Sequence, residues 1–165
     1  MEGELVVKNE NYEINKDTVA LIPKSKNKTI VYEINQTFIV NKSALSIVKN
    51  SCEYFGSSLD GRKIGTKCLV GYTHKVPIIV EESDNLIFFP TKSPRNLECS
   101  WLAYSHIYKP NRLNNKVVLE LKNGKKLLLD TSITSLERQL YRSSILELAI
   151  IDRKLQKNVE KAVKP

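Results

Sequence analysis

Short apolar runs separated by polar turns occupy the first forty residues and recur between residues 76 and 108. Short runs rich in Val, Ile and Thr, bounded by proline and polar clusters, are typical of β-strands. Pro23 should end one of them, because proline cannot donate a ladder hydrogen bond. The expected strands are Glu4–Val7, Tyr12–Ile14, Thr18–Ile22, Thr29–Ile34, Thr37–Val40, Val76–Val80, Leu86–Phe89 and Cys99–Tyr108.

A helical period replaces the strand pattern at Ser43–Phe55. Ser43 is suited to cap the first turn, and Gly56 is placed where glycines often follow a helix. The segment therefore predicts a short central helix, followed by a glycine-rich stretch. The apolar positions, spaced by three or four residues, are Leu45, Val48, Cys52 and Phe55.

A longer helix is expected at the C-terminal end, over about residues 134–163. Thr134 and Glu137 form a capping box with Thr134 as the N-cap. The segment after Asp152 has fewer apolar residues, so we expect it to fray or to pack on another chain. The expected apolar stripe is Leu136, Leu140, Leu148, Ile151, Leu155, Val159 and Ala162.

A β-hairpin is expected between these regions. Lys116–Lys122 and Lys125–Asp130 flank Asn123-Gly124, the preferred pair for a type I′ turn. Lys109–Lys116 should be a polar, basic loop. The whole pattern predicts an α+β fold, with a mostly antiparallel sheet, a short central helix and a longer C-terminal helix. No repeat or clear linker interrupts residues 1–165, so we expect a single domain.

The charge of the chain favours an anionic partner. Lys and Arg number 26 against 18 Asp and Glu, for a formal net charge of +8. Nucleic acid and an anionic membrane surface both fit this balance. Apolar runs are far shorter than the roughly 18 residues that cross a bilayer, and Met1–Glu4 lacks the features of a signal peptide. We expect a cytoplasmic protein without membrane association, and three cysteines without a CxxC pair predict no disulfide framework.

Residues Ser51–Lys67 combine glycine with positive charge. Three of the six glycines lie here, at Gly56, Gly61 and Gly65, beside Arg62, Lys63 and Lys67. Glycine lets a backbone approach a partner closely, and the cations suggest that the partner is a phosphate. We therefore predict a basic contact loop that leaves a helix C-terminus and lacks the positive dipole of a helix start. Alternatively, the glycines only build a tight turn, with Phe55 and Ile64 packed inward.

Gly56–Lys63 is close to a P-loop but departs from it. Arg62 takes the lysine position, Lys63 replaces the hydroxyl residue that would hold magnesium, and the segment should leave a strand rather than a helix. The cysteines and histidines show no paired metal-ligand spacing, and no G-x-S-x-G motif is present. We expect no cofactor, no metal site and no enzymatic activity. A nucleotide-dependent enzyme using residues 56–63 stays as an alternative.

Basic residues cluster in the expected loops, which suggests a DNA-backbone footprint. Arginine on a glycine-rich loop also suits a narrow, strongly negative minor groove. Trp101 and the tyrosines could stack on bases, but their positions on apolar patterns make core packing the better expectation. The clustered cations are Lys24, Lys26, Lys28, Arg62, Lys63, Lys67, Lys92, Arg95, Lys109, Arg112, Lys116, Lys122, Lys125 and Lys126.

The sequence resembles the ComK family of competence transcription factors of Gram-positive bacteria, from about Ser43 to Ser144. The most specific match is Cys52–Ser58, followed by Gly61-Arg62-Lys63 and Gly65-Thr66. Further matches are His74-Lys75, Pro77-Ile78, Phe89-Pro90-Thr91, Cys99, Trp101, His106, Asn123-Gly124-Lys125, Gln139 and Tyr141-Arg142.

The resemblance implies a transcription activator of DNA-uptake genes that binds AT-rich promoter boxes chiefly through the minor groove. It also implies a homodimer or higher oligomer on DNA, and RNA polymerase as a partner. In the family an adaptor that reads a C-terminal segment delivers the protein to a Clp protease. The printed sequence ends at Lys161–Pro165 without the extended apolar and aromatic tail expected there.

Combining the residues with the resemblance, we expect Arg62 and Lys63 to enter or flank the minor groove and the other cations to contact phosphates. A basic module that binds nucleic acid without sequence preference, or binds protein or a membrane surface, is the alternative. The candidate DNA-binding residues are Arg62, Lys63, Thr66, Lys67, Lys75, Lys92 and Arg95.

Overall fold

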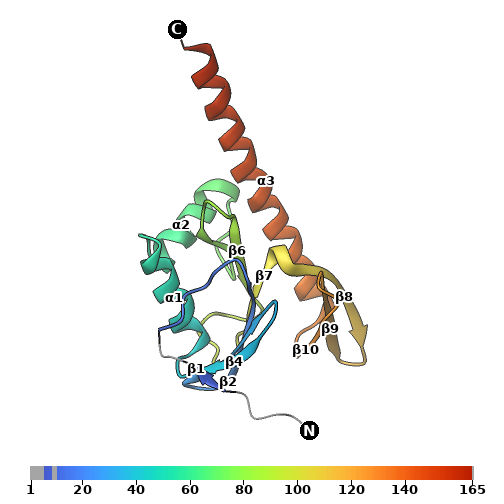
Figure 1. Ribbon diagram of the computed structural model, residues 1–165. Helices are drawn as coiled ribbons and strands as arrows, with labels where there is room; N and C mark the ends of the chain where they lie inside the picture. Colours follow the sequence, from blue (N-terminus) through green and yellow to red (C-terminus); the bar gives the residue numbers. More distant parts are fainter. Residues whose placement is uncertain (1–5, 9–10, 165) are drawn as a thin grey trace.

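A seven-stranded sheet forms the centre of the computed structural model, which describes residues 6–8 and 11–164 (Figure 1). The strand order is β1-β4-β3-β2-β7-β6-β5, and all neighbours are antiparallel except β1 and β4. Glu4 and Leu5 of the first expected strand lie outside the described residues, and Tyr12–Ile14 is not a strand. The strands are β1 (Val7–Lys8), β2 (Thr18–Ser25), β3 (Lys28–Glu33), β4 (Thr37–Val40), β5 (Ile78–Glu81), β6 (Leu86–Pro90) and β7 (Trp101–Ala103).

A second, three-stranded antiparallel sheet contains β8 (Ile107–Leu113), β9 (Lys116–Leu121) and β10 (Lys126–Leu129). The prediction of one strand over Cys99–Tyr108 is wrong, because a 3-10 turn at Tyr104–His106 carries the chain from the first sheet to the second. The prediction of a loop at Lys109–Lys116 is also wrong. Those polar residues form most of β8, which pairs with β9 while leaving many of its side chains in solvent.

The β9–β10 hairpin is confirmed, but its turn is not type I′. A type I′ turn needs positive φ at both central residues, and of Asn123 and Gly124 only Gly124 has it, at +81°. The Gly124 amide donates to the Leu121 carbonyl at 2.9 Å, and Lys125 closes the ladder with the Leu121 amide. The turn thus ends on a left-handed glycine, the arrangement of a three-residue hairpin loop.

Three helices complete the fold. Ser43 caps α1 (Ala44–Tyr54) as expected, and Gly56 follows with a φ of +77°. The second helix, α2 (Leu59–Val70), was not expected, because its two glycines and the three cations beside them suggested a loop. The third helix, α3 (Ile133–Val163), begins two residues earlier than the expected capping box: Ser132, not Thr134, is the N-cap, and its hydroxyl accepts from the Ser135 amide at 3.1 Å.

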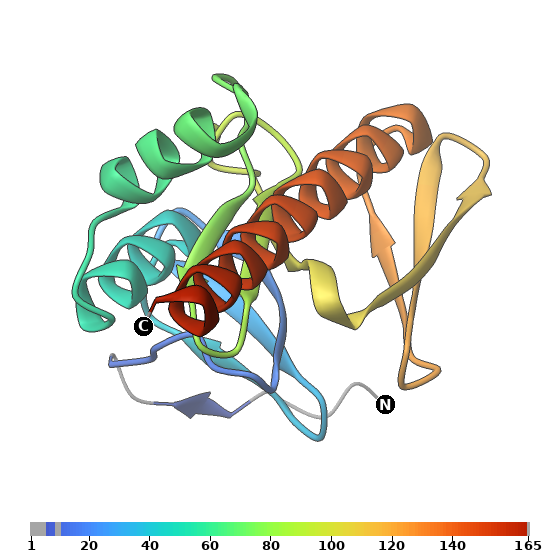
Figure 2. The same cartoon turned by 90° about the horizontal axis from the view of Figure 1, so that it is seen from above.

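Both faces of the large sheet are covered. One face packs against α1, with Phe88 and Trp101 buried beside Ile47 and Val48. The other face packs against the small sheet and the first half of α3, where Phe89 and Leu102 meet Leu136. Figures 1 and 2 show α3 running between the two helices on one side and the small sheet on the other. The placement of Trp101 confirms the expected core role.

The expected single stripe along α3 is wrong, because two different faces carry apolar residues. The face turned to the body buries Leu136, Gln139, Ser143, Leu146 and Ile150. At about 100° per residue, the apolar positions of the second half lie on the opposite side of the helix. The exposed apolar residues are Leu148, Ile151, Leu155, Val159 and Val163.

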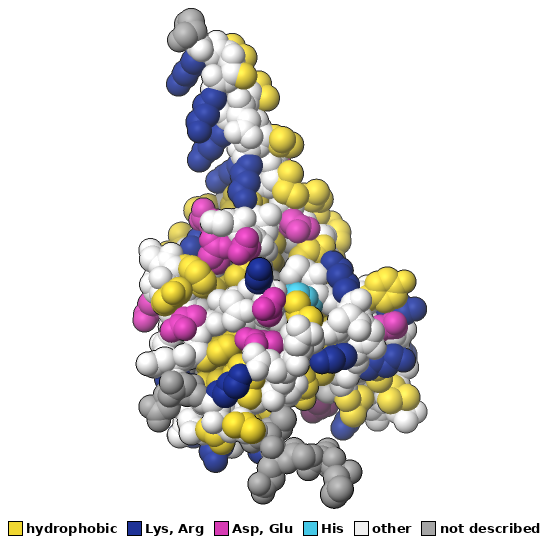
Figure 3. Space-filling model, in the orientation of Figure 1, with side chains coloured by type: hydrophobic (Ala, Val, Ile, Leu, Met, Phe, Trp, Pro, Cys, Tyr) yellow, Lys and Arg dark blue, Asp and Glu magenta, His cyan; other side chains and the backbone are white. Residues whose placement is uncertain are grey.

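Beyond Ile150 the helix projects from the body, as Figure 1 shows. Figure 3 shows Lys and Arg side chains along one side of this projection and hydrophobic side chains along the other. The described part of the chain contains no helix that is both long and apolar enough to span a membrane.

Candidate nucleic-acid interface

The predicted contact loop at Ser51–Lys67 is mostly helical. It comprises the end of α1, a turn at residues 55–58 and the first two turns of α2. Ser58 caps α2 by accepting from the Gly61 amide at 2.9 Å, and buried Leu59 anchors the first turn. A helix start therefore exists where none was expected. Ile64 is 62% exposed, so the alternative is wrong for Ile64, whereas Phe55 does pack against the core.

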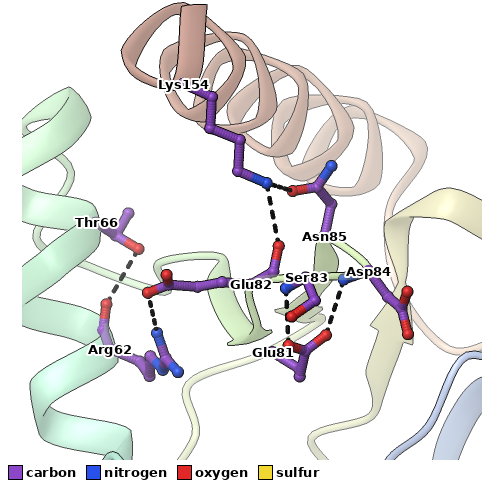
Figure 4. Close-up of polar contacts among 8 residues, drawn as sticks. All are labelled: Arg62, Thr66, Glu81, Glu82, Ser83, Asp84, Asn85 and Lys154. Atoms are coloured by element: carbon purple, nitrogen blue, oxygen red, sulfur yellow. Dashed lines mark hydrogen bonds and ion pairs between the residues drawn. The ribbon is translucent and has the colours of Figure 1, made fainter. Parts of the chain in front are cut away.

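Arg62 is turned toward the protein rather than outward. Its Nη1 donates to Glu82 Oε1 at 2.8 Å, and its side chain is only 14% exposed (Figure 4). Its Nε is buried and makes no hydrogen bond to a described residue. Arg62 can enter a DNA groove only if this ion pair opens and the side chain leaves its packed position.

Thr66 is buried as well, with 1% exposure. Its hydroxyl donates to the Pro77 carbonyl at 2.7 Å and lies 3.3 Å from the Arg62 carbonyl. These bonds fasten α2 to the segment that leads into β5. The hydroxyl thus already has acceptors inside the fold and does not face a partner.

The turn between β5 and β6 joins α2 to α3. Lys154 of α3 donates to the Glu82 carbonyl at 3.2 Å and to Asn85 Oδ1 at 3.1 Å (Figure 4). Desolvation by burial raises the pKa of the Glu81 carboxyl. Hydrogen bonds from the Ser83 and Asp84 amides outweigh this effect and hold the pKa below its usual range. The ionised carboxylate accepts both amide hydrogen bonds within the turn.

Lys63 and Lys67 are the more accessible cations of α2. Lys63 lies 4.0 Å from Asp60, one turn earlier on the same helix. Lys67 is exposed and has no ion pair among the described residues. We call Arg62, Lys63 and Lys67 the α2 basic group.

Lys75 lies in a different place, in a hollow between the α2–β5 connection and the first half of α3. The hollow has a volume of about 240 Å³ and contains three cations, Lys75, Arg138 and Arg142. No carboxylate is among its lining residues. We call it the Lys75 hollow, and its lining is His74, Lys75, Ser135, Arg138, Gln139 and Arg142.

Lys92 and Arg95 lie in the β6–β7 connection. Lys92 pairs with Glu98 at 3.0 Å and lies 3.9 Å from Asp130. Arg95 is exposed and lines a small hollow beside the N-terminus of α1. The predicted residues therefore lie on three parts of the fold, and the structure does not gather them into one site.

Sequence reasoning missed Arg138 and Arg142. They are four residues apart, so a helical register would have placed them on one face of α3. Their meeting with Lys75, more than sixty residues earlier, depends on tertiary packing. Within the described residues, no three His, Cys, Asp or Glu side chains are grouped as metal ligands.

Two of the three cysteines are buried in the core. Burial raises the pKa of the Cys52 thiol to about 11 and also raises the pKa of Cys99. Both thiols stay protonated at neutral pH and behave as small apolar side chains. Cys68 on α2 is exposed.

Comparison with known proteins finds relatives along most of the chain. Residues 9–155 match the family model described as ComK protein. The chain is 36% identical over 149 residues to the Competence transcription factor of Bacillus subtilis (strain 168), and the alignment covers 87% of this chain and 77% of that protein. No solved structure matches.

Proposed function

This chain belongs to the ComK protein family, and from that premise we propose that it is a DNA-binding transcription factor that activates competence genes. The observation that carries the proposal is the identity with a named competence transcription factor over most of both chains. The net charge of +8 supports a polyanionic partner. The function is then binding, with no catalytic step assigned to any residue.

We further propose that the DNA is AT-rich and is contacted chiefly in the minor groove. Minor-groove patterns distinguish A·T from G·C but little else, so the preference would come from groove width and bendability. The exposed candidates Lys67, Lys75 and Arg95 need no rearrangement to reach a phosphate, and Lys63 is partly buried near Asp60. Lys92 must share its ammonium with Glu98, and Arg62 must leave Glu82.

The test is a gel-shift titration of an A/T-box duplex and a G/C duplex at one salt concentration, with non-specific competitor. The expected result is tighter binding of the A/T-box duplex. Equal, weak binding of both would contradict the proposal and favour a non-specific basic module. A nucleotide effect that Gly61 substitution abolishes would instead favour the enzyme alternative.

We also propose that two copies associate through the projecting half of α3. Leu155 and Val159 expose about three-fifths of their surfaces on the side away from the body. Exposure of this apolar stripe to water is unfavourable, and contact with the same helix of a second copy would bury it. RNA polymerase and an adaptor–protease remain expected partners without an assigned surface.

Removal of residues 152–165 tests this association. The expected result is a monomer, where the full chain is a dimer, by sedimentation equilibrium. Leu155→Asp should have the same effect, while Lys157→Asp, which places the same charge on the opposite side of α3, should leave the dimer intact. An unchanged oligomer after the truncation rules out this surface.

A further inference from the structure

The Lys75 hollow has the composition of an oxyanion site. Lys75, Arg138 and Arg142 come from two segments, and no Asp or Glu in the described part of the chain lines the space between them. Three cations that face one hollow repel each other unless an anion lies among them. None of the three makes an ion pair with a described residue, in contrast to Arg62 and Lys92.

The Arg142 side chain is held in place by contacts with uncharged groups, so its positive charge is not neutralised. Arg142 Nη1 donates to the His74 carbonyl at 2.9 Å, and its guanidinium lies 5.0 Å from the centre of the Tyr72 ring. One bond and one stacking contact orient the guanidinium but leave its other N–H groups available. A planar fork held in this way is suited to a phosphate.

Gln139 ties α3 to the opposite wall, the connection between α2 and β5. It is 3% exposed, and its Nε2 donates to the carbonyls of Lys75 and Pro90, both at 2.7 Å. Lys75 adopts a φ of +47°, which is uncommon for a residue other than glycine or asparagine. The Gln139 bond to its carbonyl helps to hold this conformation.

A buried acceptor in the lining has no partner. Gln139 Oε1 makes no hydrogen bond to any described residue. Buried polar atoms in folded proteins are nearly always satisfied. A water that bridges this oxygen to a bound phosphate would supply the missing donor.

We propose that the Lys75 hollow binds a phosphate of the DNA backbone, with Arg138 and Arg142 as forked donors and Lys75 as a point charge. The proposal rests on the proposed function and adds to it a contact that sets the position of the protein on the duplex, since phosphate contacts position and base contacts specify. Free phosphate or a nucleotide has the same chemistry, so the experiment separates these sources from DNA.

Arg138→Ala is the informative variant, because this exposed side chain makes no hydrogen bond or ion pair within the described chain. Affinity for the A/T-box duplex is measured across a salt series. The expected result is roughly tenfold weaker binding at physiological salt and a salt slope shallower by about 0.9. Arg138→Lys should keep the slope but recover only part of the affinity, because it restores the charge without the fork.

Lys49→Ala is the matched control, since it removes one exposed cation from α1, outside the hollow. It should change affinity by no more than about twofold. Thermal unfolding of each variant shows that the fold is retained. If the parent binds the duplex and Arg138→Ala and Lys49→Ala reduce its affinity equally, the hollow is not a phosphate site. The proposed function would be unaffected.

A titration with inorganic phosphate at constant ionic strength, followed by NMR of the arginine side chains and His74, provides the second readout. Chemical-shift changes confined to residues of the hollow, with weak, millimolar phosphate affinity, support a contact with the DNA backbone if the Arg138→Ala variant also has the shallower salt slope. Tight phosphate binding by a parent that does not bind duplex DNA would overturn both the DNA assignment and the proposed function, leaving a site for free phosphate.

Discussion

The α2 basic group and the Lys75 hollow hold similar numbers of cations, but they differ in what surrounds them. On α2, Arg62 lies against Glu82 and Lys63 lies near Asp60. Among the described residues that line the hollow with Lys75, Arg138 and Arg142, none is Asp or Glu. A polyanion gains most from cations that are already positioned and unpaired, because no internal ion pair has to be broken first. We therefore expect the unpaired cations of the hollow, rather than the cations clustered in the sequence, to contribute more to the interface.

The largest expected effect is on stability and concerns the wall of the hollow. Gln139→Ala removes a buried side chain and leaves the Lys75 and Pro90 carbonyls without their donor. We expect the free energy of unfolding to fall by about 3 kcal/mol. Chemical denaturation measures it, with Arg138→Ala as the control that should stay within about 0.5 kcal/mol. A loss below about 1 kcal/mol would show that the hollow does not depend on Gln139.

Arg62→Ala gives the sharpest contrast between the two regions. Its side chain packs between α2 and the β5–β6 turn, so we expect a loss of about 1–2 kcal/mol in the free energy of unfolding. Glu82→Gln, which removes the charge of an exposed partner but keeps the Arg62 stem in place, should cost less than about 0.5 kcal/mol. Both are measured by denaturation.

The same Arg62 variant can break the comparison. The sequence predicts that Arg62→Ala loses DNA affinity and A/T preference, which requires Arg62 to leave Glu82 in the complex. Gel shifts with A/T-box and G/C duplexes measure whether the variant keeps this affinity and preference. Loss of A/T preference by a variant that is still folded under the assay conditions would return the groove contact to α2, whereas retained preference would show that the loop interpretation was mistaken.

Lys67→Ala should have the smallest effect. The side chain is exposed and unpaired among the described residues, so stability should change by less than about 0.5 kcal/mol. Binding to both duplexes should weaken alike, with a salt slope shallower by about one unit if Lys67 contacts a phosphate. A slope equal to that of the parent, beside a reduced slope for Arg138→Ala, would exclude α2 from the backbone contact.

Local patterns explain the elements that were predicted well. Ser43 and the apolar spacing after it determine α1. The β9–β10 turn needs a residue with positive φ, and Gly124 provides it. The helix α2 was missed because Gly61 and Gly65 each lower helix propensity by about 1 kcal/mol relative to alanine. The Ser58 cap, the buried Leu59 and the Thr66 bond to Pro77 offset that cost, and only the first is a local signal.

The sequence by itself determined the α+β class, the long last helix, the excess of positive charge and the family. The first three follow from periodicity, capping and composition, which act over a few residues or over the whole chain, whereas the family follows from ordered motif matches such as Cys52–Ser58. Tertiary structure decided which face of α3 meets the body, which cations form ion pairs with a carboxylate and which remain unpaired among the described residues. Those outcomes depend on contacts such as Arg62 with Glu82 and Gln139 with Lys75, between residues 20 and 64 positions apart, and no local rule brings them together.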